Sequence, residues 1–308
     1  MNSMKYSILS FIFALTFSNL SFGQYYEDIT NYEEEEKTLA RLGQRILNAA
    51  LYQDRDSACK AFKTHLSSLL AKDDSIKLPF DRVGNLMKVR SADSTIRILT
   101  WSLLDANNSY HYFGFIQRLK ADGDYLLYEL KDRSDQIVNP EKLVLSSENW
   151  WGSMYYDVAL INNGLKDMYT ILGWDGNNNM SHKKVIDIFY FDRDDSLRFG
   201  SPIIRERREV YYRKIFEFSA EVSMQMAFQR HLNRIIFESL SPSNPSLVGV
   251  YEYYGPAFIF DAYNWGGRYW DYEADIDVEE GLEKKDKAFE VKHRDTIQSK
   301  NLFKPYGK

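Results

Sequence analysis

The spacing of apolar residues changes near Pro79, from a helical period to a strand period. Before that point two apolar stripes recur every three or four residues, the first at Leu39, Leu42, Ile46 and Ala50 and the second at Ala58, Phe62, Leu66 and Leu69. Such spacing puts the apolar side chains on one face of an α-helix, and that face has to be buried. The pattern therefore predicts a helical hairpin within residues 24–84.

Beyond Pro79, apolar and polar residues alternate in short runs separated by turn signals such as Asp122-Gly123. The runs predicted to be strands cover residues 95–104, 110–119, 125–128, 168–174, 185–191, 210–218, 235–240, 248–254 and 269–278. They leave little room for crossover helices, so the strands should be antiparallel. We expect an α+β fold in which residues 85–280 form one large antiparallel β domain, either a sandwich or an open sheet.

An internal repeat gives an alternative topology. Residues 96–115 can be aligned with residues 168–189, which places Trp101 on Trp174 and an asparagine-rich turn after each. Strand sets then recur about every 35–40 residues, a period typical of propeller blades. The later sets lack the shared tryptophan, so a propeller-like repeat remains the alternative to a sandwich or open sheet.

The two ends of the chain predict export and a surface tail. Residues 1–23 carry one lysine, an apolar run from Ser7 to Phe17, and small residues around Gly23, in the order of a signal peptide. The apolar run is too short to cross about 30 Å of hydrocarbon as a helix, and no later run is long enough. We expect a periplasmic protein first and a secreted or surface-exposed one second, without a membrane span after cleavage. Residues 281–308 are highly charged and should form a C-terminal tail.

Composition narrows the function classes. A single cysteine, Cys59, forbids an internal disulfide, and its place beside the second helical stripe predicts a small buried apolar side chain. The net charge of −5 is spread along the chain, so no basic face predicts a nucleic-acid partner. The five histidines lack metal-ligand spacing, and nucleophile and phosphate-loop motifs are missing. We therefore expect no cofactor, while the oligomeric state is not indicated.

The loop Gly173–Lys184 is the one segment that resembles a metal site. Oxygen-bearing side chains occupy three alternate positions, Asp175, Asn177 and Asn179. The first three ligands of a calcium loop have this spacing, but such a loop also needs a glycine and a glutamate where this chain has Met180 and Ile186. We favour a structural turn between two strands, with Gly176 at positive φ, and keep calcium as the weaker alternative.

Four acids alternate along the last predicted strand. They are Asp271, Glu273, Asp275 and Asp277. On a strand they would share one face, which favours a solvated edge strand whose charges repel other chains. The alternative is the carboxylate pair of a glycoside hydrolase, with Trp265 and Trp270 as a platform for the sugar.

Aromatic residues suggest a binding face. Trp150 and Trp151 lie in one aromatic stretch, and Tyr254 lies in a second. Neighbouring residues on a strand point to opposite faces, so some of these rings should be exposed, as rings that bind sugars or proteins are. Together with Trp265 and Trp270 they are the predicted ligand-binding residues. We expect a non-catalytic binding or scaffolding protein with a glycan or an envelope protein as its ligand; the alternative is a carboxylate-dependent hydrolase acting on polysaccharide or envelope glycan.

A resemblance agrees with this expectation. The segment Gly173-Trp174-Asp175-Gly176-Asn177, followed by Lys183-Lys184-Val185-Ile186-Asp187 and later by Tyr253-Tyr254-Gly255-Pro256, resembles a set of exported, uncharacterised proteins of the Bacteroidota. The resemblance implies an envelope or secreted location and no particular activity.

Overall fold

The computed structural model describes residues 32–72 and 74–277. Its helical part consists of a helix over residues 32–48 and α2 (Tyr52–Leu70), which together form the predicted hairpin. Each residue of the second apolar stripe, from Ala58 to Leu69, is at most 3% exposed, as the helical period predicts. Ala50 lies in the turn between the helices instead of on the first stripe. The predicted signal peptide (residues 1–23) and the predicted C-terminal tail (residues 281–308) lie outside the described residues.

Within the described residues, the β part contains three sheets. The first has the order β1 (Met87–Arg90), β2 (Ile96–Leu104), β3 (Tyr110–Leu119) and β4 (Tyr125–Lys131). The second has the order β5 (Leu145–Ser146), β9 (Leu197–Phe199), β8 (Ser181–Phe191), β7 (Asp167–Asp175) and β6 (Met154–Asn162), with β12 (Lys214–Ser219) also paired to β8. The third has the order β11 (Glu209–Tyr211), β10 (Ile204–Glu206), β16 (Trp270–Glu273), β15 (Tyr254–Trp265), β14 (Arg234–Pro242) and β13 (Met226–Gln229).

Short 3-10 helices connect these strands. They are η1 (Ser75–Lys77), η2 (Ser134–Gln136), η3 (Pro140–Lys142), η4 (Arg230–Leu232), η5 (Pro245–Leu247) and η6 (Tyr251–Tyr253). The last two lie in the connection between β14 and β15, which becomes important for the candidate site.

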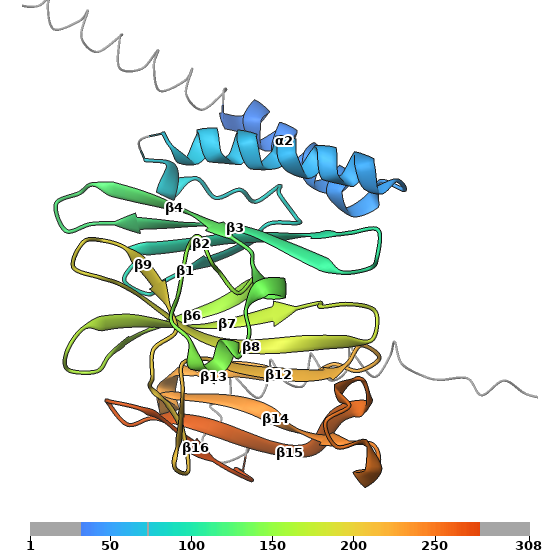
Figure 1. Cartoon of the computed structure of the whole chain (residues 1–308). Coiled ribbons are helices and arrows are strands. Elements are labelled where there is room, and N and C mark those ends of the chain that lie inside the picture. Colours follow the sequence, from blue (N-terminus) through green and yellow to red (C-terminus); the bar gives the residue numbers. More distant parts are fainter. Residues whose placement is uncertain (1–31, 73, 278–308) are drawn as a thin grey trace, which may run out of the picture.

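The sheets are stacked in layers below the helices (Figure 1). One core cluster joins the helices to the first sheet, a second joins the first sheet to the second, and a third joins the second sheet to the third. The first two sheets are therefore covered on both faces, so both sides of β2 are apolar: Ile98 enters one core and Leu99 the other. Among the described residues there is neither a closed barrel nor a propeller.

Cys59 lies in the core between the helices and the first sheet. It is 2% exposed, and the indole Nε1 of Trp101 donates to its Sγ at 3.3 Å. Burial raises the pKa of the Cys59 thiol to about 11, so the thiol stays protonated at neutral pH. The prediction of a small buried side chain is confirmed.

The third sheet corrects several predicted strands. Residues 248–254 do not form a strand, because η6 occupies their second half and β15 begins only at Tyr254. The run 210–218 is broken at Tyr212 and Arg213, and the run 269–278 ends as a strand at Glu273. One pair, β10 with β16, is parallel, so the β part is not wholly antiparallel. No helix in the described ranges is both long and apolar enough to cross a membrane.

Candidate functional site

Three of the predicted ligand-binding tryptophans lie in the core. Trp150 is 0% exposed, Trp270 is 2% exposed and Trp151 is 8% exposed. The indole Nε1 of Trp150 donates to the hydroxyl of Tyr155 at 2.7 Å, and that of Trp270 donates to Thr170 Oγ1 at 3.0 Å. Rings enclosed in this way cannot form an exposed binding face, so this part of the prediction is corrected. Trp150 and Trp151 pack in the core between the first two sheets, and Trp270 packs in the core between the second and third sheets, so none of the three rings has an exposed side.

Trp265 and the four acids lie around the β15–β16 hairpin. Trp265 is only partly buried and packs against Trp270 with ring centroids 5.2 Å apart. Asp271 pairs with Arg205, and Glu273 accepts a hydrogen bond of 2.6 Å from Asn264 Nδ2. The carboxylates therefore face different partners.

The strand that should align the acids is shorter than predicted. It ends at Glu273, and Asp275 has a φ of 55°, which turns the backbone out of the strand. The backbone N–H of Asp275 then donates to Asp261 Oδ1 at 3.0 Å. Asp277 lies still further along the chain, so the expected row of four acids on one face is wrong.

The loop between β7 and β8 is tied to the first sheet. The Tyr112 hydroxyl donates to Asp175 Oδ1 at 2.8 Å and accepts from the backbone N–H of Gly176 at 2.7 Å. The N–H of Tyr110 donates to the carbonyl of Asn177 at 3.0 Å. The loop therefore joins two sheets in addition to two strands.

Two of the three expected calcium ligands are engaged by protein groups. Asp175 is 4% exposed, and its Oδ1 also accepts the N–H of Asn177 at 2.7 Å. The amide oxygen of Asn177 accepts from Lys183 Nζ at 2.9 Å, while Asn179 is exposed. A lysine ammonium held at one oxygen disfavours a second cation there.

Gly176 is needed for space and not for its φ. The positive φ of 45° belongs to Asn177, so the prediction of positive φ at Gly176 is wrong. A Cβ atom at Gly176 would lie 2.5 Å from the ring of Tyr110 and 2.7 Å from that of Trp174. The glycine therefore lets the loop pass between two aromatic rings.

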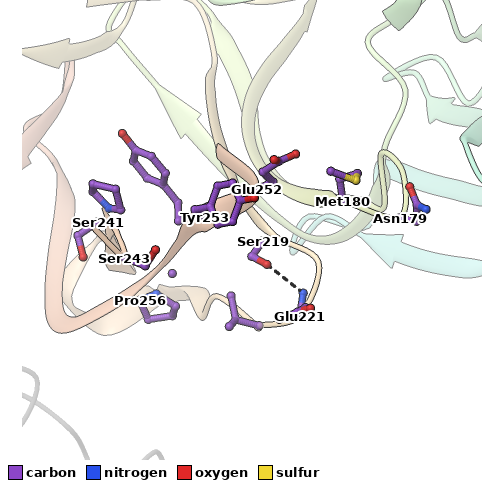
Figure 2. A pocket seen from close by; sticks show the side chains of 13 residues that line it. Asn179, Met180, Ser219, Glu221, Ser241, Ser243, Glu252, Tyr253 and Pro256 are labelled. Carbon is purple, nitrogen blue, oxygen red and sulfur yellow. Dashed lines mark hydrogen bonds between the residues drawn. The ribbon is translucent and has the colours of Figure 1, made fainter. Parts of the chain in front are cut away.

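The strongest candidate for a binding site is an open groove of about 530 Å³ where the β8, β12, β14 and β15 strands end. Figure 2 shows Asn179 and Met180 on one side and Ser241, Ser243 and Pro256 on the other. The lining residues are Asn179, Met180, Ser219, Glu221, Val222, Ser241, Pro242, Ser243, Glu252, Tyr253, Tyr254, Gly255 and Pro256. We call this the Tyr253 groove.

Backbone hydrogen bonds hold the walls of the Tyr253 groove. On one side, Ser243 N–H donates to the carbonyl of Tyr253 at 2.9 Å, which closes η6 onto the end of β14. On the other side, Ala220 N–H donates to the carbonyl of Met180 at 3.0 Å. Gly255 also lines the groove, and a Cβ atom placed there would contact only Val222, at 3.8 Å.

The charged side chains that line the groove are both acids, Glu221 and Glu252. The remaining polar groups are serine hydroxyls and the Asn179 amide, while the apolar surface comes from Met180, Val222, two prolines and two tyrosines. The groove therefore offers carboxylates and hydroxyls beside aromatic rings, and its lining includes no lysine, arginine or histidine.

Exposed apolar side chains extend along the segments that form the groove. Exposed fractions are 48% for Tyr253, 38% for Val222, 92% for Phe258 and 45% for Ile259. Phe258 has a φ of 62° and lies where the β14–β15 register shifts. Positive φ is costly for an aromatic residue, and such strain is concentrated at functional sites. The apolar surface beside the groove is therefore consistent with a binding role.

Sequence reasoning found one residue of this groove among its predicted ligand-binding residues. Tyr254 lines the wall, and its hydroxyl accepts the N–H of Gly249 at 3.0 Å. The available signal was the Tyr253-Tyr254-Gly255-Pro256 run, in which two rings precede residues that interrupt regular strands. The groove residues beside β8 and β12 are 30 or more positions away in the chain, and the sequence pattern singled out only Asn179 among them, as a candidate calcium ligand.

A second hollow, of about 520 Å³, lies between the end of α2 and β4. Its buried polar group, Gln117, accepts from Arg97 Nε at 2.8 Å and donates to Ser75 Oγ at 2.8 Å. Because these bonds satisfy the amide within the protein, the hollow offers less for a ligand than the Tyr253 groove.

Lys184 is an isolated amine between the second and third sheets. It lies opposite Phe216 of β12, and its Nζ is 4.5 Å from the ring centroid of Tyr156. Tyr156 occupies a β-bulge in β6, and its hydroxyl donates to the carbonyl of Met226 at 3.1 Å. No ion pair joins Lys184 to a carboxylate within the described ranges. Burial lowers the pKa of Lys184 to about 8.

Replacing this amine should stabilise the protein at neutral pH. We expect Lys184→Met to raise the free energy of unfolding by about 1–2 kcal/mol at pH 7, because the folded wild type holds a desolvated charge. The gain should be complete below pH 8 and should vanish as the pH rises towards about 10.4, where the unfolded lysine also becomes neutral. Urea unfolding at pH 7 and pH 10 measures both values. Lys60→Met, on the exposed face of α2, is the control, and a pH-independent gain would contradict the explanation.

Comparisons of the chain with family models, with curated proteins and with solved structures found no match. Within residues 32–72 and 74–277, no three acids, histidines or cysteines are grouped so as to hold a metal ion. The chemistry of the Tyr253 groove therefore carries the functional proposal.

Proposed function

We propose that this protein is an exported, non-catalytic binding or scaffolding module of the cell envelope, and that it binds its ligand in the Tyr253 groove. The ligand is an envelope protein segment or a glycan. The export signal read from residues 1–23 supports the location, and the groove supports the binding role.

The observation that carries the proposal is the combination of an open groove with exposed rings and hydroxyls. Ligand sites are concave, largely apolar, and carry a few polar groups that orient the ligand. The Tyr253 groove has these properties, with a tyrosine ring 48% exposed at its edge. Tyrosine combines a large apolar area with a hydroxyl that remains hydrated, which suits both sugars and protein segments.

The acids that the sequence singled out on the β15–β16 hairpin give a hydrolase less support. A glycosidase needs two carboxyl groups about 5–10 Å apart on either side of the bond that it cleaves. Asp271 is paired with Arg205, and Glu273 is bonded to Asn264 on the same hairpin. These contacts hold the candidate acids at the surface of the third sheet, outside the Tyr253 groove.

Titration calorimetry with two sets of probes tests the proposal: defined envelope oligosaccharides, and short peptides that carry lysine beside aromatic residues. A probe that binds the wild type should bind Tyr253→Ala about tenfold more weakly, since a lost aromatic contact of about 1.4 kcal/mol has that effect. Tyr125→Ala is the matched control, because Tyr125 is 38% exposed on β4, in the sheet beneath the helices. Equal affinities for the two variants, or cleavage of a glycan probe, would reject the proposal.

A further inference from the structure

One segment of the same chain complements the Tyr253 groove in charge and shares its apolar character. We propose that residues 296–308 dock in the Tyr253 groove and cover it, so that an outside ligand has to displace them. This inference rests on the proposed binding function and adds a regulator of that site.

The chemistry of the segment complements that of the groove. Residues 296–308 read TIQSKNLFKPYGK and contain three lysines and no acid. Their apolar side chains are Ile297, Leu302, Phe303, Pro305 and Tyr306. The groove lining has the opposite balance, with two glutamates, no cation, and apolar surface from methionine, valine, proline and tyrosine. Opposite charge with shared apolar character favours specific docking.

The two groove glutamates are available for such a partner. Glu221 is exposed and Glu252 is partly exposed. No ion pair joins either carboxylate to a lysine or arginine in the part of the chain that the structure describes. An ammonium group from the docked segment could approach both acids without displacing an existing partner.

The described chain ends close to the strand that forms the groove wall. Ile276 N–H donates to the carbonyl of Phe260 at 2.8 Å, and Phe260 lies on β15, the strand that begins with Tyr254, Gly255 and Pro256. Phe260 follows Pro256 by four positions, which corresponds to about 13 Å along a strand.

The intervening residues provide ample length. Residues 278–295 make up 18 positions, and a chain of that length can extend up to about 60 Å. Because the segment is tethered, its effective concentration at the groove reaches the millimolar range, so weak contacts are enough to occupy the site.

Disulfide trapping in the full chain tests the proposal. One cysteine replaces Ser243 in the groove and another replaces Ser299 in the segment, which leaves the lysines and apolar residues unchanged. The natural Cys59 is 2% exposed and does not compete. In the control chain, Ser68→Cys replaces Ser243→Cys, because Ser68 is exposed on α2, and α2 lies in a different layer from β12, β14 and β15, which border the groove (Figure 1).

We expect the intramolecular disulfide to the groove to form at least about tenfold faster than the disulfide to α2. Adding Glu221→Gln and Glu252→Gln should abolish most of that difference, as should high salt, which screens exposed charges. Equal rates for the two cysteine pairs would overturn the proposal, and so would a faster groove pair that is insensitive to both the glutamates and salt. A disulfide-linked dimer as the main product would also overturn it, because the segment would then come from a second copy.

Failure of the disulfide-trapping experiment can be distinguished from failure of the proposed binding function. If trapping fails while Tyr253→Ala still weakens binding of an added probe, the groove is a binding site that this segment does not cover. If trapping succeeds, deleting residues 296–308 should strengthen probe binding, since the probe no longer competes with a tethered occupant.

Discussion

Arg213→Met should lower the free energy of unfolding by about 3–5 kcal/mol, the largest effect that we expect from a single substitution in this protein. Arg213 and Asp187 form an ion pair in which both side chains are 0% exposed, with Arg213 Nε 3.1 Å from Asp187 Oδ2. Removing the guanidinium leaves a carboxylate buried without its counter-charge. Equilibrium urea unfolding at pH 7 measures the loss.

The contacts of the Arg213 guanidinium explain why its replacement should destabilise the protein so strongly. Its Nη1 donates to the carbonyl of Leu143 at 3.2 Å and also to that of Pro140, so it fixes the η3 loop against the second sheet. Gly200, with a φ of 89°, lies so close that a Cβ atom there would be 2.9 Å from Arg213 Nη2. The site is thus built around the guanidinium.

Two further measurements separate charge from packing in the Arg213 variant. The double variant Arg213→Met with Asp187→Leu should recover much of the loss, because no charge remains buried. Burial raises the pKa of Asp187 above its ordinary value even beside Arg213, so the folded chain binds a proton more readily than the unfolded chain. Without Arg213, which lowers it in the wild type, the pKa of Asp187 is higher still in the variant. The deficit of Arg213→Met should therefore shrink as the pH falls from the variant's pKa towards that of the wild type. A deficit that persists in the double variant and at low pH would point to lost packing instead.

Gly176→Val should cost about 3 kcal/mol, because its side chain would have to enter the space of two rings. Even a bare Cβ would lie 2.5 Å from the ring of Tyr110. The substitution would push the loop away from the first sheet and weaken the Tyr112 hydroxyl bridge between Asp175 and the Gly176 N–H. Thermal or urea unfolding gives the loss.

Two further variants of the same loop, Asn179→Ala and Asp175→Ala, test the calcium alternative. Asn179→Ala should change stability by less than about 0.5 kcal/mol, since an exposed side chain is removed, and added calcium should leave the melting temperature unchanged. A calcium-dependent rise in the melting temperature that Asp175→Ala abolishes would show that the loop is a metal site after all.

Local sequence patterns were enough for elements that are buried on one face or are long and regular. The stripe from Ala58 to Leu69 predicted α2, and the alternation in residues 110–119 predicted β3 with the bounds Tyr110–Leu119. Both follow from backbone geometry, which sets the side-chain period within one element. The α+β class and the change of period near Pro79 could be read for the same reason.

Strand ends, and strands interrupted by specific contacts, could not be read in this way. The run 210–218 looked continuous, but Arg213 turns into the core towards Asp187, which is 26 positions earlier. β15 was not predicted, because Gly255 and Pro256 near its start are residues that usually interrupt strands. Phe258, within the strand, also has a positive φ. No local window contains the partners that decide these positions.

The residues of the candidate site, too, could be predicted from the sequence only in part. The sequence identified Tyr254 because its run of rings was conspicuous, but it also selected Trp150 and Trp270, whose exposure depends on the layers above and below them. The Tyr253 groove combines residues from 179 to 256, so its acids and serines could be assembled only after the sheets were stacked.

By itself, the sequence determined the helical hairpin, regular strands such as β2, β3, β7 and β8, the burial of Cys59 and the absence of an internal disulfide, because each depends on local period or on composition. The tertiary structure alone decided which aromatic rings are exposed, why Gly176 has to be a glycine, and where a groove forms. Those properties depend on contacts between residues far apart in the chain, and burial on both faces of a stacked sheet removes the apolar-polar contrast from which exposure is read.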